Sequence, residues 1–277
     1  MSPAARLWAA IRGRLLALAA VAGLVFLFAP LAVVVAFSFN DPEGRYNLTW
    51  SGFTLDHWRN PFGAPGLGEA VSNSVLIAVV SSVIAVALGT LLALGLVRHR
   101  FRGKGATELF VFLPLATPEV ILGASLLGLF LTLNFATGLV TIVLGHVTFC
   151  LSYVVVTIRA RLEGLDGHLE EAARDLGANE WGTLWLVTLP LLAPAIGGAL
   201  LLALALSFDD FVTTNFNSGQ TLTLPMYIWG AARQGVPPEV NVLASVTLLL
   251  AVIVFVTRLA GPRLGASRRP VVGERSA

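Results

Sequence analysis

The sequence predicts an all-α membrane protein with six transmembrane helices, and three observations support this fold class. Of the 277 residues, 56% are hydrophobic and only 12% are charged, whereas soluble domains carry about 25% charged residues. The apolar residues form blocks of about 20, which is the length a helix needs to cross a hydrocarbon core. The basic residues are concentrated in alternate connecting segments, which is typical of multispanning proteins with a fixed orientation.

We expect a six-span domain over residues 15–262, between an N-terminal segment 1–14 and a C-terminal tail 263–277. The first apolar block is too long for a signal peptide and lacks a small-residue cleavage site, so we interpret it as an anchored span. The expected spans are Leu15–Phe37, Val71–Val97, Leu109–Leu131, Leu139–Ile158, Leu191–Phe211 and Val242–Leu259.

The basic residues predict the orientation of these spans. Of the 18 Lys and Arg residues, all but Arg45, Arg59 and Arg233 lie in the terminal segments, in the loops after the second and fourth spans, or, for Arg258, at the inner end of the sixth span. The positive-inside rule therefore predicts that both termini are cytoplasmic. The net charge of +2 is too small to indicate a nucleic-acid partner. The single Cys150 provides neither a disulfide framework nor a metal site.

A polar segment interrupts the apolar sequence between the fourth and fifth spans, over residues of about 166–190. Asp166 can cap a helix that begins near Gly167, and Glu170 and Arg174 have the i,i+4 spacing of a helical ion pair. Gly177 is a suitable stop, after which a second helix can run toward the next span. We expect a helix–turn–helix that projects into the cytoplasm; an amphipathic loop on the membrane surface is the alternative.

The residues of this loop resemble the EAA motif of ABC importer permeases. The matching pattern is Glu171-Ala172-Ala173, three residues, Gly177, nine residues, Val187, one residue, and Leu189-Pro190. Only Val187 departs from the motif, where isoleucine is usual. The resemblance implies a type I ABC importer permease fold, with a cytoplasmic coupling helix that docks on the ATP-hydrolysing subunit. It assigns coupling to Glu170, Glu171, Ala172, Ala173, Gly177, Ala178, Leu189 and Pro190.

Further segments are similar to the polyamine branch of this family. They are Leu113–Phe130, Gly145–Asp166, Leu206–Gly219 and Thr223–Ser245. The resemblance implies an inner-membrane permease for spermidine, putrescine or a related cation that works by ATP-driven alternating access. Another small solute is the alternative substrate.

The resemblance also implies the partners of the chain. It predicts a second homologous permease, two ATP-binding subunits, a periplasmic solute-binding protein and membrane lipid. The chain has no glycine-rich phosphate loop, so ATP and Mg²⁺ are expected on the partner subunits and the chain itself is not expected to be an enzyme. A secondary transporter is an alternative from another class, and six spans without a visible internal repeat count against it. A membrane scaffold is a second alternative, and it leaves the glycine-broken loop unexplained.

Carboxylates at membrane depth are costly and indicate functional sites. Glu119 follows Pro118 in the third span, where Pro114 and Pro118 both interrupt helical hydrogen bonding. A broken helix exposes backbone carbonyls toward a cavity or other protein. Carbonyls together with a carboxylate suit an ammonium group; the alternative is that Glu119 only satisfies freed backbone amides.

Asp209 and Asp210 end the fifth span, roughly 27 Å from its inner edge. We expect them to attract the substrate at the periplasmic mouth; solvation at a helix end is the alternative. A carboxylate at a helix C-terminus opposes the macrodipole, so capping is not expected. Successive helical positions point about 100° apart, so one of the two should face the pathway. His146, in the fourth span, is a further candidate for the substrate pathway as a proton relay. A packed, hydrogen-bonded histidine is the alternative, and we favour it.

Met226, Tyr227 and Trp229 lie in the last outer loop. They are candidates for contact with the binding protein. Aromatic residues at the membrane interface also anchor helices, and the sequence leaves both interpretations open.

Overall fold

The computed structural model describes residues 3–44 and 46–264, with side chains over 12–44 and 46–257. The expected tail 263–277 lies almost entirely outside this part of the chain. The helices are α1 (Pro3–Phe37), α2 (Asp56–Arg59), α3 (Leu67–Arg98), α4 (Lys104–Ala116), α5 (Glu119–Thr132), α6 (Leu139–Glu163), α7 (His168–Asp175), α8 (Glu180–Thr183), the π-helix η1 (Leu184–Thr188), α9 (Leu189–Asp209), α10 (Val212–Asn217), α11 (Leu224–Gln234) and α12 (Pro238–Leu264).

The predicted all-α fold class is confirmed. Within the described residues, one isolated bridge between Asn40 and Phe53 is the only strand-like pairing. In the same part of the chain, five helices are long and apolar enough to cross a membrane. The bent pair α4–α5 makes a sixth span if it is counted as one.

The third span is sharply broken. Helices α4 and α5 meet at an angle of 115°. Thr117, which precedes Pro118, is extended, with a ψ of 130°, because a proline disfavours helical backbone in the residue before it. Pro114 lies inside α4 and does not end it. The break therefore occurs at Pro118 alone.

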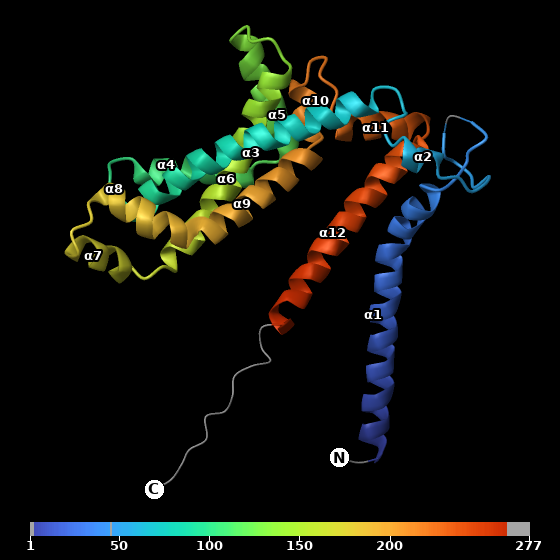
Figure 1. The fold of residues 1–277 in the computed structure, drawn as a ribbon, viewed down its shortest axis with the longest axis horizontal. Coiled ribbons are helices and arrows are strands. Elements are labelled where there is room, and N and C mark those ends of the chain that lie inside the picture. The colour runs from blue at the N-terminus through green and yellow to red at the C-terminus, as the bar shows by residue number, and fades with distance from the viewer. Residues whose placement is uncertain (1–2, 45, 265–277) are drawn as a thin grey trace. The chain divides into compact units, whose positions relative to one another are not determined.

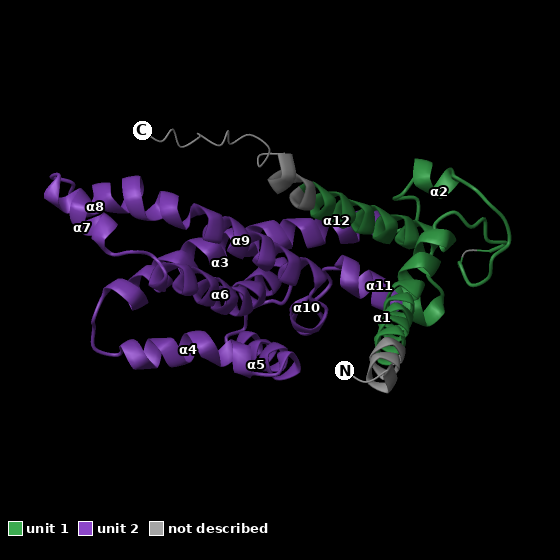
Figure 2. Cartoon of the chain, turned by 90° about the horizontal axis from the view of Figure 1, so that it is seen from below, with its two compact units in different colours: residues 1–65, 231–277 green, residues 66–230 purple. Residues whose placement is uncertain are grey.

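The chain divides into two compact units, residues 1–65 with 231–277 and residues 66–230 (Figure 2). The first unit contains α1, α2 and α12. Its connection between α1 and α2 is ordered by a buried amide pair, in which Asn40 Nδ2 donates to Asn47 Oδ1 at 2.6 Å. His57 on α2 lies 3.6 Å from Glu239 on α12. Phe39 stacks on both Phe53 and Trp58.

The second unit is built on α3, α6 and α9, which run side by side (Figure 1). Small residues bring these helices close together, as is common between membrane helices. A Cβ atom on Gly89 of α3 would lie 2.6 Å from Val154 Cγ1 of α6, so a larger residue does not fit there. The core of the trio consists mainly of Ala85, Ala93, Cys150, Val154, Ile158, Leu192, Ala199 and Ala203.

The short helix α10 packs against α5 and α6 in the same unit. A Cβ atom on Gly123 of α5 would lie 2.8 Å from the Phe216 ring. Asn217 Nδ2 donates to the carbonyl oxygens of Gly123, at 3.3 Å, and Thr213, at 2.9 Å. The contacts with Gly123 hold α10 against α5.

Candidate functional site: the polar loop and a buried polar cluster

The loop between α6 and α9 forms the expected helix–turn–helix. The His168 N–H donates to Asp166 Oδ1 at 3.0 Å, so Asp166 stabilises the start of α7. Gly177 has a φ of +90°, a left-handed conformation that glycine adopts at little cost. The N–H groups of Gly177 and Ala178 donate to the carbonyls of Arg174 and Ala173, which is the usual way a helix ends at such a glycine.

The second helix of the loop, expected to run toward the fifth span, continues into it without a break. Together α8, η1 and α9 form one continuous helical stretch over Glu180–Asp209. Pro190 is tolerated in the first turn of α9, directly after the π-helical segment η1. Single π-helical turns inside longer helices are rare and are frequently found at functional sites.

The residues assigned to the EAA motif differ in exposure. Glu171, Ala172, Gly177 and Pro190 are exposed, whereas Glu170, Ala173, Ala178 and Leu189 are half-buried. His168 Nδ1 lies 3.2 Å from Glu171 Oε2, and this hydrogen bond is the main cause that raises the pKa of His168.

Glu170 does not form the expected ion pair with Arg174. Its Oε1 atom lies 2.7 Å from Arg98 Nη2, at the end of α3, and accepts a hydrogen bond from Thr188 Oγ1 at 3.0 Å. Sequence spacing could not reveal this contact, because Arg98 lies 72 residues away from Glu170.

The loop also presents large apolar side chains. The sequence pattern indicates Leu176 as part of an apolar stripe on the first helix but does not indicate Trp181. Leu176 is 90% exposed and Trp181 is 69% exposed. Exposed aromatic and aliphatic residues that gather on one surface are typical of protein–protein contacts. In the sequence, Leu176 and Trp181 are apolar residues close to Gly177 within the polar loop.

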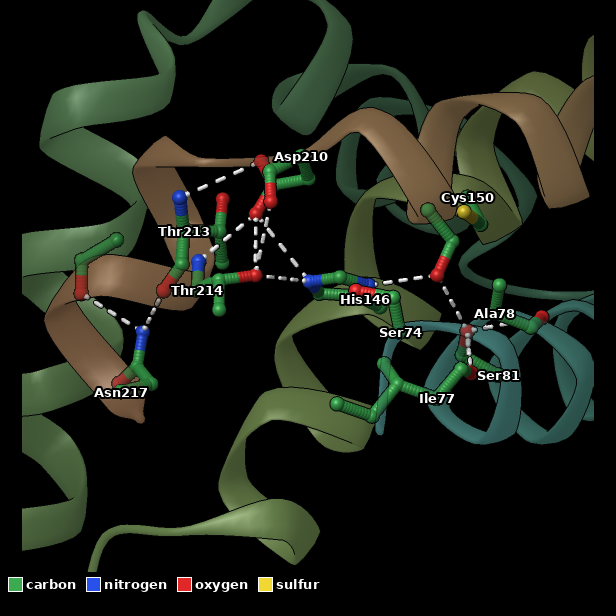
Figure 3. Close-up of polar contacts among 12 residues, drawn as sticks. Ser74, Ile77, Ala78, Ser81, His146, Cys150, Asp210, Thr213, Thr214 and Asn217 are labelled. Carbon is green, nitrogen blue, oxygen red and sulfur yellow. Dashed lines mark hydrogen bonds and ion pairs between the residues drawn. The ribbon is translucent and has the colours of Figure 1, made fainter. Parts of the chain in front are cut away.

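A second polar feature lies inside the helical unit, centred on His146 of α6 (Figure 3). The His146 ring is 1% exposed. Its Nδ1 lies 2.6 Å from Ser207 Oγ on α9, and its Nε2 lies 2.9 Å from Thr214 Oγ1 on α10. Ser207 Oγ is in turn 2.9 Å from Ser81 Oγ on α3. His146 is therefore packed and hydrogen-bonded, and it joins four helices.

Asp210 belongs to this buried cluster, and the expectation that it is not a capping residue was wrong. Its carboxylate accepts hydrogen bonds from the N–H groups of Thr213, at 3.3 Å, and Thr214, at 2.8 Å. The reason is that α9 ends at Asp209 and a new helix begins at Val212. Asp210 thus lies at the positive end of α10, where a carboxylate is favourable.

The two neighbouring carboxylates have different surroundings. The Asp210 side chain is 6% exposed and lies 3.2 Å from His146 Nε2, whereas Asp209 is exposed. Glu119 is also exposed and is the first residue of α5, directly after Pro118. The cluster therefore contains His146 and Asp210 but neither Asp209 nor Glu119.

On α11, Met226 and Tyr227 are half-buried and Trp229 is 52% exposed. The Trp229 ring lies 5.0 Å from the ring of Phe211, which directly follows the buried carboxylate Asp210. Within the described side chains, no group of three or more His, Cys, Asp or Glu residues could hold a metal ion.

Comparison with known proteins identifies the family. The model of the "binding-protein-dependent transport system inner membrane component" family matches residues 85–267. The chain belongs to this family. It is a permease of the ABC importer class, as the EAA resemblance implied.

Two relatives illustrate the similarity of the permease to curated proteins. It is 39% identical over 232 residues to the spermidine/putrescine transport system permease protein PotC of Haemophilus influenzae, covering 83% of this chain and 90% of the relative. It is 41% identical over 234 residues to the putrescine transport system permease protein PotI of Escherichia coli, covering 82% and 83%.

Solved structures support the fold of the permease. A chain of a bacterial ABC transporter involved in the import of the acidic polysaccharide alginate superposes with a TM-score of 0.65 at 16% identity, covering 96% of this chain and 99% of that chain. A chain of the MetNI methionine ABC transporter gives a TM-score of 0.56 at 16% identity, covering 72% and 94%. At this level of identity the likeness concerns the fold alone.

Proposed function

We propose that this permease is the membrane-spanning subunit of an ABC importer for a polyamine such as spermidine or putrescine. The observation that carries the proposal is the identity of 36–41% to polyamine permeases over more than four fifths of the chain. The exposed carboxylates Asp209 and Glu119 support a cationic substrate, because an ammonium group inside a membrane protein needs a compensating charge.

The substrate pathway is proposed to use Asp209 and Glu119 as the carboxylates that contact the polyamine. Pro118 contributes by breaking the third span, because the break leaves backbone carbonyls free to accept hydrogen bonds from ammonium groups. Asp210 and His146 act differently in this proposal. They hold α10 and the end of α9 in place, since both side chains are buried and bonded to each other and to Thr214.

The chain works with partners in this proposal. A second homologous permease completes the pathway, and two ATP-binding subunits hold ATP and Mg²⁺ and perform hydrolysis, so this chain is not catalytic. A periplasmic solute-binding protein delivers the substrate and contacts Met226, Tyr227 and Trp229. The surrounding lipid contacts the apolar helices, and both termini lie in the cytoplasm, as the positive-inside rule predicts.

Coupling is proposed to run through the loop of residues 166–190. Helix α7, the turn at Gly177 and the exposed Leu176 and Trp181 form the surface that docks on the ATP-binding subunit. Closure of the ATP-binding subunits moves this surface and rocks α3, α6 and α9, which opens the pathway alternately to each side.

Uptake in cells that lack polyamine transport tests this function. Cells that express the permease with its partner subunits and binding protein should accumulate labelled putrescine or spermidine, and unlabelled polyamine should compete whereas an uncharged solute should not. Uptake of another solute with no response to polyamines would favour the alternative, an importer for a different small solute.

A further inference from the structure

Glu170 lies where three helical elements meet. It belongs to α7, its partner Arg98 is the last residue of α3, and Thr188 is the last residue of η1, directly before α9. One carboxylate oxygen, Oε1, receives both contacts, at 2.7 Å from Arg98 Nη2 and at 3.0 Å from Thr188 Oγ1. Helix α7 is therefore joined to the end of α3 and to the segment that directly precedes α9 through one atom.

The exposure of these side chains shows that this is not an ordinary surface ion pair. The Glu170 side chain is 15% exposed and the Arg98 side chain is 29% exposed, and Thr188 is buried. Exposed ion pairs contribute little because water and salt screen them. Partial burial and the additional hydrogen bond from Thr188 both strengthen this one.

Helix α7 has few other ways to hold its position. None of its residues is buried, and a helix of eight residues is too short to be stable alone. It is bounded by Gly167 on one side and by the left-handed Gly177 on the other. Glu170 thus supplies a specific, directional link between this short helix and the transmembrane helices.

The contact at Thr188 falls on the π-helical segment. Thr188 Oγ1 also lies 3.4 Å from the Thr183 carbonyl oxygen, so its hydroxyl is shared between the segment's own backbone and Glu170. Single π-helical turns within longer helices are rare and are frequently found at functional sites. If α7 moved, the hydrogen bond between Glu170 and Thr188 would transmit the movement to η1 and so to the start of α9.

From this geometry we propose that Arg98, Glu170 and Thr188 form a tie that transmits movement of α7 to α3 and α9. Glu170 is then a positioning residue that faces the permease itself and not the ATP-binding subunit, whereas its neighbour Glu171 is exposed. The inference rests on the proposed coupling role of the loop, and it assigns that role to a defined set of contacts.

Charge exchange tests the tie in the complete, reconstituted importer. Arg98→Glu and Glu170→Arg each place two like charges together, and the double variant restores an opposite pair. We expect each single variant to lower the ratio of polyamine-stimulated to basal ATP hydrolysis by roughly fivefold or more, as for coupled neighbouring groups. The double variant should recover most of this ratio. The control is Arg102→Glu, an exposed basic residue close to Arg98 in sequence, which should leave the ratio unchanged.

A second measurement is independent of transport. Hydrogen exchange of the α7 amides in the purified complex should accelerate in both single variants and return to the wild-type rate in the double variant. Copurification of the ATP-binding subunit shows whether each variant still assembles. Unchanged exchange in the single variants, or a double variant no better than the worse single variant, would overturn the tie.

The two measurements separate this inference from the proposed function. If no solute stimulates the wild-type importer but the exchange pattern is as expected, the tie stands and the transport assignment fails. If a polyamine stimulates the wild type and both single variants behave like it, the assignment stands and the tie is wrong.

Discussion

The Oδ2 atom of Asp210 lies 3.2 Å from the Nε2 atom of His146, whereas the adjacent residue, Asp209, is exposed. Two neighbouring carboxylates therefore occupy different environments at the end of the same helix. Asp210 accepts hydrogen bonds at the start of α10, and Asp209 is the one we propose to contact the substrate. Substitutions at the two positions should accordingly affect different properties of the permease.

Asp210→Asn should mainly reduce stability. The change removes the charge from a buried carboxylate that accepts hydrogen bonds from Thr213 and Thr214, and a hydrogen bond to a charged group contributes about 1.5–3 kcal/mol. We expect a lower melting temperature and a lower yield of the assembled complex in detergent. A variant with wild-type stability and assembly would contradict a structural role for Asp210.

Asp209→Asn should reduce transport without reducing stability. The side chain is exposed, so removing its charge leaves no buried group unpaired. If Asp209 contacts the polyamine, the KM for uptake should rise by about tenfold, equivalent to about 1.4 kcal/mol of lost attraction. Melting temperature serves as the control, and an unchanged KM would remove Asp209 from the pathway.

Gly177→Asp should uncouple ATP hydrolysis from transport while membrane insertion remains normal. The φ of +90° at this position costs most side chains about 1–2 kcal/mol, and the new carboxylate would lie in the proposed docking surface. Gly177→Asn is the matched control, because asparagine tolerates this conformation and carries no charge. Normal uptake by the aspartate variant would contradict the assignment of the loop.

Leu176→Ala should weaken docking of the ATP-binding subunit. Leu176 is 90% exposed, so its removal should leave the stability of the permease nearly unchanged. If it is buried by the partner, truncation should cost about 1–2 kcal/mol of binding, measurable as a five- to thirtyfold rise in Kd. Leu201→Ala is the control, because Leu201 is 64% exposed on α9, outside the loop. Equal affinities for both variants would exclude Leu176 from the contact.

Local sequence signals predicted the all-α fold class and the long apolar helices. Blocks of apolar residues are long, and a glycine at a helix end has a clear physical reason, so α3, α6 and the turn at Gly177 could be anticipated. The break in the third span was also expected from its prolines. The structure adds that only Pro118 causes it, because Thr117 is the residue that leaves the helical conformation.

Contacts between distant segments could not be predicted in the same way. The Arg98–Glu170 pair joins residues from different helices, and the i,i+4 spacing favoured a local partner, Arg174, instead. The role of Asp210 depends on where α9 ends and α10 begins, and no glycine or proline marks that boundary between Ser207 and Asn217. Both errors arise because tertiary structure selects among several partners that are each locally reasonable.

The most direct test of the central claim is ATP hydrolysis by the reconstituted complex with its binding protein, measured with spermidine, putrescine and an uncharged solute. We expect a polyamine to stimulate hydrolysis and the uncharged solute to leave the rate unchanged. Equal rates under all three conditions, with the complex fully assembled, would contradict the assignment of this permease to polyamine import.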